Sequence, residues 1–249
     1  MRVRAGTSGY SYAEWKGNFY PEKTAAKDML GFYASRFPAV EINNTFYRMP
    51  KEDLLLGWAA QVPESFAFAI KAPQKITHIA RLKDAGDLVT YLYRVTASLA
   101  ARLGPLLFQL PPNFKKDVPR LAAFLKALPD RRRVAFEFRH ASWFDDEVFA
   151  ALRARGVALC VADTGEEPAA PLVATADWGY LRLRRELFSD DQLAEWARRI
   201  AAQPWSDAFV FLKHEEEGKG PKLAARLMAL AGADAVPAGA APPAAEPRA

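Results

Sequence analysis

The sequence lacks the marks of a secreted, membrane-embedded or zinc-dependent protein. Its single cysteine, Cys160, excludes an internal disulfide, and its place in an apolar run predicts a buried, inert thiol. Only three histidines occur, which disfavours a histidine-rich multinuclear zinc centre. No apolar run approaches bilayer-spanning length, and residues 1–10 lack the apolar stretch of a signal peptide. We therefore expect a cytoplasmic protein that contacts no membrane.

A strong charge of one sign is also missing. The 34 lysines and arginines face 29 aspartates and glutamates, which leaves a formal net charge of +5. This mild excess favours a small anionic ligand, and nucleic acid is an alternative partner. A basic solvated surface explains the same charge equally well. The sequence does not indicate an oligomeric state.

Two parts of the chain differ sharply in composition. The chain has 249 residues, of which 51% are hydrophobic, and this suits a single barrel domain over residues 1–231. Residues 232–249 are almost entirely alanine, proline and glycine. Such a segment buries too little apolar surface to offset chain entropy, so we expect a disordered tail.

Short β-type runs alternate with segments of helical periodicity along the first part of the chain. This alternation is typical of βα units that form a parallel sheet. The expected strands are Val3–Thr7, Val40–Asn43, Phe66–Lys71, Leu106–Leu110, Val134–Arg139, Val157–Asp163, Gly179–Leu183 and Ala208–Lys213. They predict a TIM-type (β/α) barrel of about eight parallel strands.

Nearly every expected strand ends in a polar or charged residue. In a TIM barrel these carboxyl ends line the active site. Alternation along strands places Ala67, Ala69 and Lys71 on one face, with Lys71 above the alanines. The candidate acids and bases are Glu137, Asp163 and Glu41, and the candidate anion-binding cations are Lys71, Arg139 and Arg182.

Further candidate ligand contacts come from the same strand ends and from two long loops after the first and third strands. They are Asn43, Tyr10, Trp15, Thr45, Gln109, His78 and Lys213. The amides of the turn Gly6–Gly9 are additional donors for an anion. A competing interpretation is structural: the charges form an ion-pair network that closes the barrel, and the aromatics of the loops plug its top.

Several sequence blocks resemble one known family. GTSGYSYAEWKGNFYP, EINNTFYRMP, FAFAIKAPQKITH, FQLPPNF, AFEFRHASWF, ADT and YLRLR are similar to the signature blocks of the YecE-like family, domain of unknown function 72. The resemblance covers residues 3–230 and implies a TIM-type barrel without implying a reaction. The chain departs from the family pattern in two places. After Arg182 the pattern continues towards a His-Gly, whereas this chain reads Leu183-Arg184-Arg185. The last strand of the pattern ends in an aromatic followed by paired asparagines, whereas this chain reads Phe211-Leu212-Lys213-His214.

Two functions remain open for such a chain. The first is an enzyme that acts by acid–base chemistry on a phosphate-bearing small molecule or nucleotide, as a hydrolase, isomerase or lyase. No cofactor is required, and a carboxylate site for Mg²⁺ or Mn²⁺ is a minor alternative. The second is a non-catalytic nucleic-acid or phosphate-ligand binder, in which interleaved basic and aromatic residues of 10–23 and 131–143 contact phosphates and bases.

Overall fold

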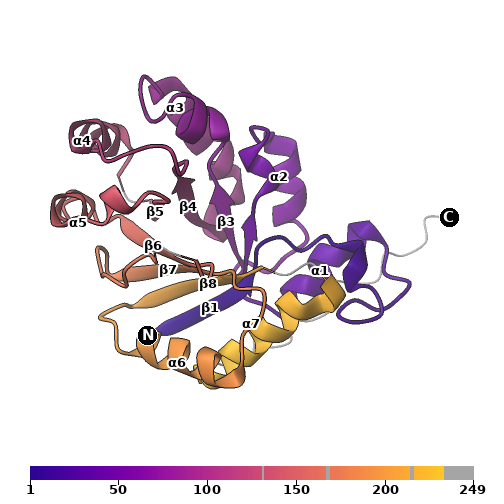
Figure 1. Ribbon diagram of the computed structural model, residues 1–249. Helices are drawn as coiled ribbons and strands as arrows, with labels where there is room; N and C mark the ends of the chain where they lie inside the picture. The colour runs from indigo at the N-terminus through magenta and orange to yellow at the C-terminus, as the bar shows by residue number, and fades with distance from the viewer. Residues whose placement is uncertain (131, 167–168, 214–215, 233–249) are drawn as a thin grey trace.

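Eight parallel strands form the centre of the molecule (Figure 1). The computed structural model describes residues 1–130, 132–166, 169–213 and 216–232. The strands are β1 (Arg2–Thr7), β2 (Ala39–Ile42), β3 (Ala67–Lys71), β4 (Leu103–Gln109), β5 (Val134–Glu137), β6 (Ala158–Asp163), β7 (Trp178–Leu183) and β8 (Asp207–Leu212). All eight lie within a few residues of the ranges expected from the sequence.

The sheet curls until its first two strands meet. Strand pairs follow one another from β2 to β8, and β8 pairs with β1. A single parallel bridge between Ser8 and Glu41 joins β1 to β2, and the amide of Gly9 donates to the Glu41 carbonyl at 2.8 Å. Glycine is required beside this bridge, because a Cβ at Gly6 would lie 2.0 Å from the carbonyl oxygen of Ala39. The result is a nearly closed TIM-type barrel, as predicted.

The α-helices surround the strands on the outside (Figure 1). They are α1 (Met29–Ala34), α2 (Glu52–Ala59), α3 (Gly86–Thr96), α4 (Val118–Ala127), α5 (Asp146–Arg153), α6 (Asp190–Ala201) and α7 (Lys219–Leu230). Within the described residues, every strand except β6 is followed by one of them. Helix α6 begins with a capping box in which Ser189 and Gln192 exchange side-chain to backbone hydrogen bonds.

Two separate groups of buried side chains result from strand alternation. The larger group lies between the strands and the helices. The smaller group fills the barrel and includes Ala67, Ala69, Cys160, Tyr180 and Phe211. Ala67 and Ala69 therefore face inward as predicted, and Cys160 is a buried free thiol. The inward faces set the positions of the polar residues at the strand ends.

Two sequence-based expectations concern regions that the structure leaves largely undescribed. The tail lies outside the described residues from Ala233 onward, so its disorder stays a prediction, and His214 also lies outside them. In the described part of the chain, no helix combines the length and apolar character needed to cross a bilayer.

Candidate functional site

A buried arginine lies at the centre of the carboxyl end of the barrel. Arg182 is 0% exposed and its guanidinium contacts two carboxylates from other strands. Its Nη2 lies 2.9 Å from Oε1 of Glu41, and its Nη1 lies 2.6 Å from Oε2 of Glu137. Asn43 accepts a longer hydrogen bond from Nη2 at 3.4 Å. Arg182 therefore links β7 to both β2 and β5.

Neutral side chains satisfy the remaining oxygens of the two glutamates. Ser8 donates to Oε1 of Glu41 at 2.7 Å, and Tyr180 donates to Oε2 at 2.7 Å. Gln109 donates to Oε1 of Glu137 at 2.7 Å. Because buried charges persist only when they are paired and hydrogen-bonded, this network explains how three ions lie inside the barrel.

The network holds both glutamates in the ionised form. Burial alone would raise the pKa of Glu41, but the charge of Arg182 and the hydrogen bonds from Asn43 and Ser8 lower it to about 2. Glu137 behaves similarly: burial raises its pKa, the charge and hydrogen bond of Arg182 lower it, and the net shift is downward. Carboxylates that hold on to their negative charge are poor proton donors and weak bases at neutral pH. The structure therefore argues against Glu41 and Glu137 as the titrating acid and base.

The role expected of Arg182 also needs correction. The sequence suggests that spare guanidinium donors contact a ligand, but Arg182 is fully buried and its Nε, Nη1 and Nη2 all donate to protein oxygens. Arg182 is consequently a structural cross-link beneath the barrel mouth. The contacts of Arg182 thus favour the competing ion-pair interpretation at this position.

Lys71 is a charged side chain in this region without a carboxylate partner among the described residues. It ends β3 above Ala69, is 9% exposed, and its Nζ lies 4.1 Å from the centre of the Phe46 ring. Among the described residues, Nζ makes no hydrogen bond or ion pair. Burial lowers the pKa of Lys71 to about 8, and the nearby positive charge of Arg182 contributes to the shift.

Thr45 and His78 surround the Lys71 region. Thr45 is buried and donates to the Lys71 carbonyl at 2.7 Å, so it positions the end of β3. His78 lies in a short π-helix, Lys75–Ile79, and its ring packs edge-on against Phe46 at 4.8 Å between ring centres. Burial, followed by the charges of Lys71 and Arg139, lowers the pKa of His78. A π-helix of this length is often found at functional sites.

Two further arginines lie at the open end of the barrel. Arg139 and Arg184 follow β5 and β7 at positions of the same parity as the inward-facing Glu137 and Arg182. Arg139 is exposed and Arg184 is half-buried, and neither side chain has an ion pair in the described part of the chain. A cavity of about 90 Å³ beside Glu137 is lined by Arg139, Ala162, Thr164 and Glu166, among others. Burial and the charge of Arg182 lower the pKa of Arg184.

Asp163 does not join this group. It has the parity of Val161, which packs on the outer side of β6, whereas Cys160 faces the interior. Its carboxylate pairs with Nε of Arg185 at 2.7 Å and accepts a hydrogen bond from the Trp196 indole of α6 at 3.0 Å. The expectation that Asp163 lines the mouth is therefore wrong, because its side chain faces the outer side of β6.

The loop aromatics belong mainly to the outer core. Trp15 is 1% exposed and packs against Tyr12, Phe19 and Tyr20, so its ring offers little surface to a ligand. Tyr10 is partly buried with its ring 6.2 Å from that of Tyr33. These rings are engaged in packing and are not presented for stacking on bases.

The remaining expected contacts have definite positions. Asn43 donates to Glu41 at 2.9 Å, and Gln109 lies on the inward face of β4 against Glu137. Lys213 is partly buried and follows β8, where its amide donates to the carbonyl of Leu183 at 3.3 Å. The turn Gly6–Gly9 is not a free anion site, because the amides of Thr7, Ser8 and Gly9 all donate to protein acceptors.

Three residues that the candidate set omits contribute to the site: Ser8, Tyr180 and Arg184. Tyr180 and Arg184 lie two positions before and after Arg182, so strand alternation predicts from the sequence that all three share a face. Ser8 carried no comparable signal, since its contact with Glu41 depends on closure of the barrel between β1 and β2.

Two other polar cavities of the described surface also carry basic side chains, several of which are already ion-paired. A cavity of about 340 Å³ includes Arg4 and Arg133, which both contact Asp207, and one of about 700 Å³ includes Lys116 and Arg120, which have carboxylate partners of their own.

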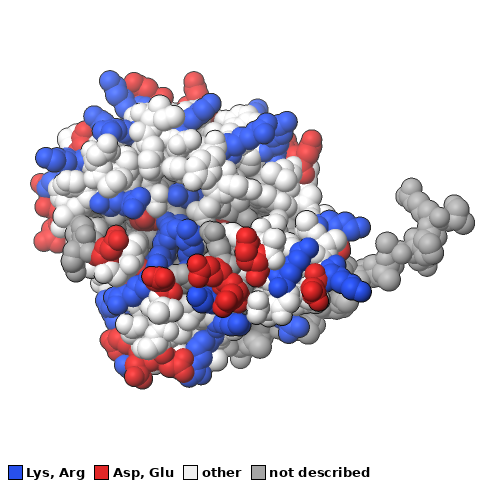
Figure 2. Space-filling model, turned by 45° about the vertical axis from the view of Figure 1, so that its right-hand side comes forward, with Lys and Arg blue, Asp and Glu red and all other residues white. Residues whose placement is uncertain are grey.

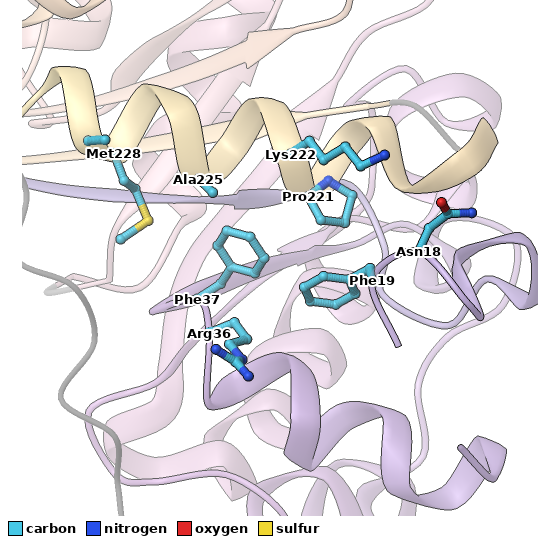
Figure 3. Close-up of a pocket in the computed structure, with 9 residues that line it drawn as sticks. Asn18, Phe19, Arg36, Phe37, Pro221, Lys222, Ala225 and Met228 are labelled. Carbon is cyan, nitrogen blue, oxygen red and sulfur yellow. The ribbon is translucent and has the colours of Figure 1, made fainter. Parts of the chain in front are cut away.

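Basic and acidic side chains are interspersed on the face shown in Figure 2. A cavity of about 500 Å³ lies outside the barrel, where Phe19 and Phe37 face Pro221 and Ala225 of α7 (Figure 3), and its mainly apolar lining does not suit an anion. Among the described residues, no three His, Cys, Asp or Glu side chains are grouped as metal ligands.

The fold and the charged strand ends define a TIM-type α/β barrel with a polar mouth. The protein-family model described as "Protein of unknown function DUF72" matches residues 4–247, and the chain belongs to this family. The matched region includes most of residues 232–249.

Relatives of known sequence and structure agree with this assignment. The chain is 35% identical over 138 residues to UPF0759 protein YecE of Escherichia coli strain K12, covering 53% of this chain and 51% of YecE. UPF0759 protein YunF of Bacillus subtilis strain 168 is 30% identical over 158 residues, with 59% of this chain and 56% of YunF covered. The chain thus spans about half the length of these curated relatives.

Two solved structures share the fold over nearly their full length. The DUF72 family protein TM1631 of Thermotoga maritima has a TM-score of 0.80 and 26% identity, covering 92% of this chain and 99% of that protein. The DUF72 family protein EF0366 of Enterococcus faecalis has a TM-score of 0.78 and 18% identity, with 93% and 96% covered.

Proposed function

We propose that the chain is an enzyme that acts on an anionic, phosphate-bearing small molecule by acid–base chemistry at the carboxyl end of its barrel. The observation that carries this proposal is the unpaired amine of Lys71 at the end of β3. Both neighbouring glutamates are held by Arg182, so no carboxylate neutralises Lys71. A pKa of about 8 lets Lys71 exchange a proton near neutral pH.

Arg139 and Arg184 supply the proposed contacts to the anion. They follow two different strands, β5 and β7, at positions of inward-facing parity, and have no carboxylate partner among the described residues. Guanidinium groups suit phosphate because their donors match its oxygens in pairs. Glu137 lines the adjacent cavity as a carboxylate, where it stabilises positive charge that develops during the reaction.

The alternative is a protein that binds nucleic acid or a phosphate ligand without turnover. Two observations disfavour an extended nucleic-acid surface. The aromatic ring of Trp15 is buried, and charges of both signs are mixed on the visible face (Figure 2). Single-stranded binding proteins combine a basic groove with accessible rings.

The proposal is tested by incubating the protein with a panel of sugar phosphates and nucleotides and following each by ³¹P nuclear magnetic resonance. We expect turnover of at least one compound, loss of turnover in Lys71→Met, and retention in Arg226→Ala, which alters a surface ion pair between α7 and α6. Salt-dependent binding of single-stranded DNA without turnover of any compound would support the alternative instead.

A further inference from the structure

We propose that Lys71 forms a covalent imine with an aldehyde or ketone, so that the substrate is a phosphate-bearing carbonyl compound. This inference rests on the proposed function and specifies its substrate class. It assigns Lys71 the role of nucleophile in addition to proton exchange.

The position of Lys71 suits a covalent contact with a small molecule. The side chain continues the inward face of β3 above two alanines, so it lies at the open end of the barrel interior. It keeps 9% of its surface exposed, and the Phe46 ring packs against its amino group at 4.1 Å. A lysine in this setting is withdrawn from bulk water while remaining accessible from the mouth.

The surroundings leave the nitrogen lone pair available. The charged groups around Lys71 are Glu41 from β2, Glu137 from β5, Arg182 and Arg184 from β7 and its end, and His78 from the π-helix. The two carboxylates favour the ammonium form, as does the face of Phe46. Burial and the two guanidinium groups oppose it, and the pKa is lowered to about 8. About a tenth of the molecules therefore carry the neutral amine at pH 7.

The proposed step is balanced without an oxidant or a metal. The Lys71 nitrogen bonds to the carbonyl carbon, and the C=O π electrons move to the oxygen, which takes up the proton released by the nitrogen. The resulting carbinolamine loses its hydroxyl group as water after protonation, and a C=N⁺ iminium remains. This iminium withdraws electrons from an adjacent C–H or C–C bond. Hydrolysis by water returns the free amine.

The arginines at the mouth explain why the carbonyl compound should carry phosphate. Arg139 and Arg184 continue the inward-facing positions of β5 and β7 and remain without carboxylate partners in the described residues. A phosphate held there orients the carbonyl carbon towards Lys71 and raises its local concentration. A carbonyl compound without phosphate would react with the same amine more slowly.

The test uses wild-type protein with glycolaldehyde phosphate or glycolaldehyde, in the presence of cyanoborohydride, which reduces an imine to a stable secondary amine. Peptide mapping by mass spectrometry then locates the labelled lysines. We expect Lys71 to react at least about tenfold faster than any other lysine at pH 7, because its amine is the more often neutral. The labelling rate should rise with pH and level off above about pH 8. Lys71→Arg should lose this label, whereas Lys75→Arg, at an exposed position on the π-helix, should keep it.

The two aldehydes separate this inference from the proposed function. Preferential labelling of Lys71 by glycolaldehyde phosphate supports both. Equal labelling of Lys71 by both compounds supports the imine and contradicts the phosphate site. Labels spread over the surface lysines overturn the inference, even if inorganic phosphate still raises the melting temperature of the protein. Because the decisive measurement is made on the wild-type chain, it does not depend on whether a variant folds.

Discussion

Nη1 of Arg182 lies 2.6 Å from Oε2 of Glu137, which places an ion pair between β7 and β5 inside the barrel. Both side chains are almost fully buried, and Arg182 also contacts Glu41 from β2. Water cannot replace a partner that is lost at this depth. Arg182, Glu41 and Glu137, which the sequence suggested as ligand-binding and catalytic residues, therefore cross-link the strands at the barrel mouth. This cross-link stabilises the strand ends from which Arg139 and Arg184 project.

Arg182→Met should destabilise the fold strongly. The substitution leaves Glu41 and Glu137 buried without their common cation, and breaking a buried pair in this way costs about 3 to 5 kcal/mol. Urea denaturation followed by circular dichroism measures the change. The matched control is Arg226→Ala, because Arg226 and Asp190 form an exposed pair on α7 and α6 worth no more than about 1 kcal/mol. Equal losses in the two variants would contradict the structural role of Arg182.

Glu41 should make the fold sensitive to acid. Its folded pKa of about 2 is below its ordinary value of 4.5, so its contribution is fully present above about pH 4.5 and is lost as the pH falls towards 2. The shift corresponds to about 3 kcal/mol. Glu41→Gln should therefore be less stable than the parent at pH 7, and the difference should shrink below pH 4. A difference that stays constant from pH 7 to pH 3 would show that charge is not responsible.

Closure of the barrel should depend on Gly6. A Cβ at this position would lie 2.0 Å from the backbone oxygen of Ala39, so Gly6→Ala must push β1 away from β2 and disturb the contact between Ser8 and Glu41. We expect a loss of several kcal/mol in chemical denaturation, comparable to severe overpacking. Gly57→Ala is the control, because a Cβ added at this helical position meets nothing within 4 Å beyond its chain neighbours and the backbone of its own helix. Alanine should stabilise α2 by up to about 1 kcal/mol.

Lys71 should destabilise the protein at neutral pH. Its folded pKa of about 8 is below the ordinary 10.5, so the folded state binds fewer protons, and the cost is full below about pH 8 and disappears above about 10.5. Lys71→Met removes this cost but also loses the contact of the ammonium group with Phe46. The net effect should be a rise in the free energy of unfolding at pH 7 of about 1 to 3 kcal/mol. The gain should decrease when denaturation is repeated at pH 10. A gain that is absent at pH 7, or equal at both pH values, would contradict a buried charge at this position.

Strand alternation made much of the barrel predictable from the sequence. The small inward residues Ala67 and Ala69 indicated the orientation of Lys71, because a narrow interior excludes larger side chains there. In β6 the neighbours Cys160 and Val161 are both apolar, so residue type does not show which of them faces inward. The expected position of Asp163 on the inward face is wrong for this reason. The position of Trp15 was equally hard to predict, because a loop tryptophan is compatible both with packing in a core and with contact to a ligand.

The partners of each ion could not be predicted, because they depend on how distant strands meet. Glu41 and Arg182 are separated by 141 positions in the chain, and only the closed barrel brings them within 2.9 Å. Arg182 forms ion pairs with two carboxylates, whereas Arg139 and Arg184 form none among the described residues. The numbers of cations and carboxylates in the sequence do not reveal this difference. That distinction moves the predicted anion site from Arg182 to the other two arginines.

Phosphate should stabilise the protein through Arg139 and Arg184. A ligand that binds only the folded state at ten times its dissociation constant adds about 1.4 kcal/mol. For a chain of this size, that corresponds to a rise in melting temperature of roughly 3 to 5 °C. Differential scanning fluorimetry in phosphate, against chloride of equal ionic strength, separates binding from charge screening. Arg139→Ala and Arg184→Ala should each remove much of the gain because each loses guanidinium donors at the mouth, whereas Arg226→Ala should keep it. If both mouth variants respond to phosphate as the parent does, the anion binds elsewhere and these arginines have another role.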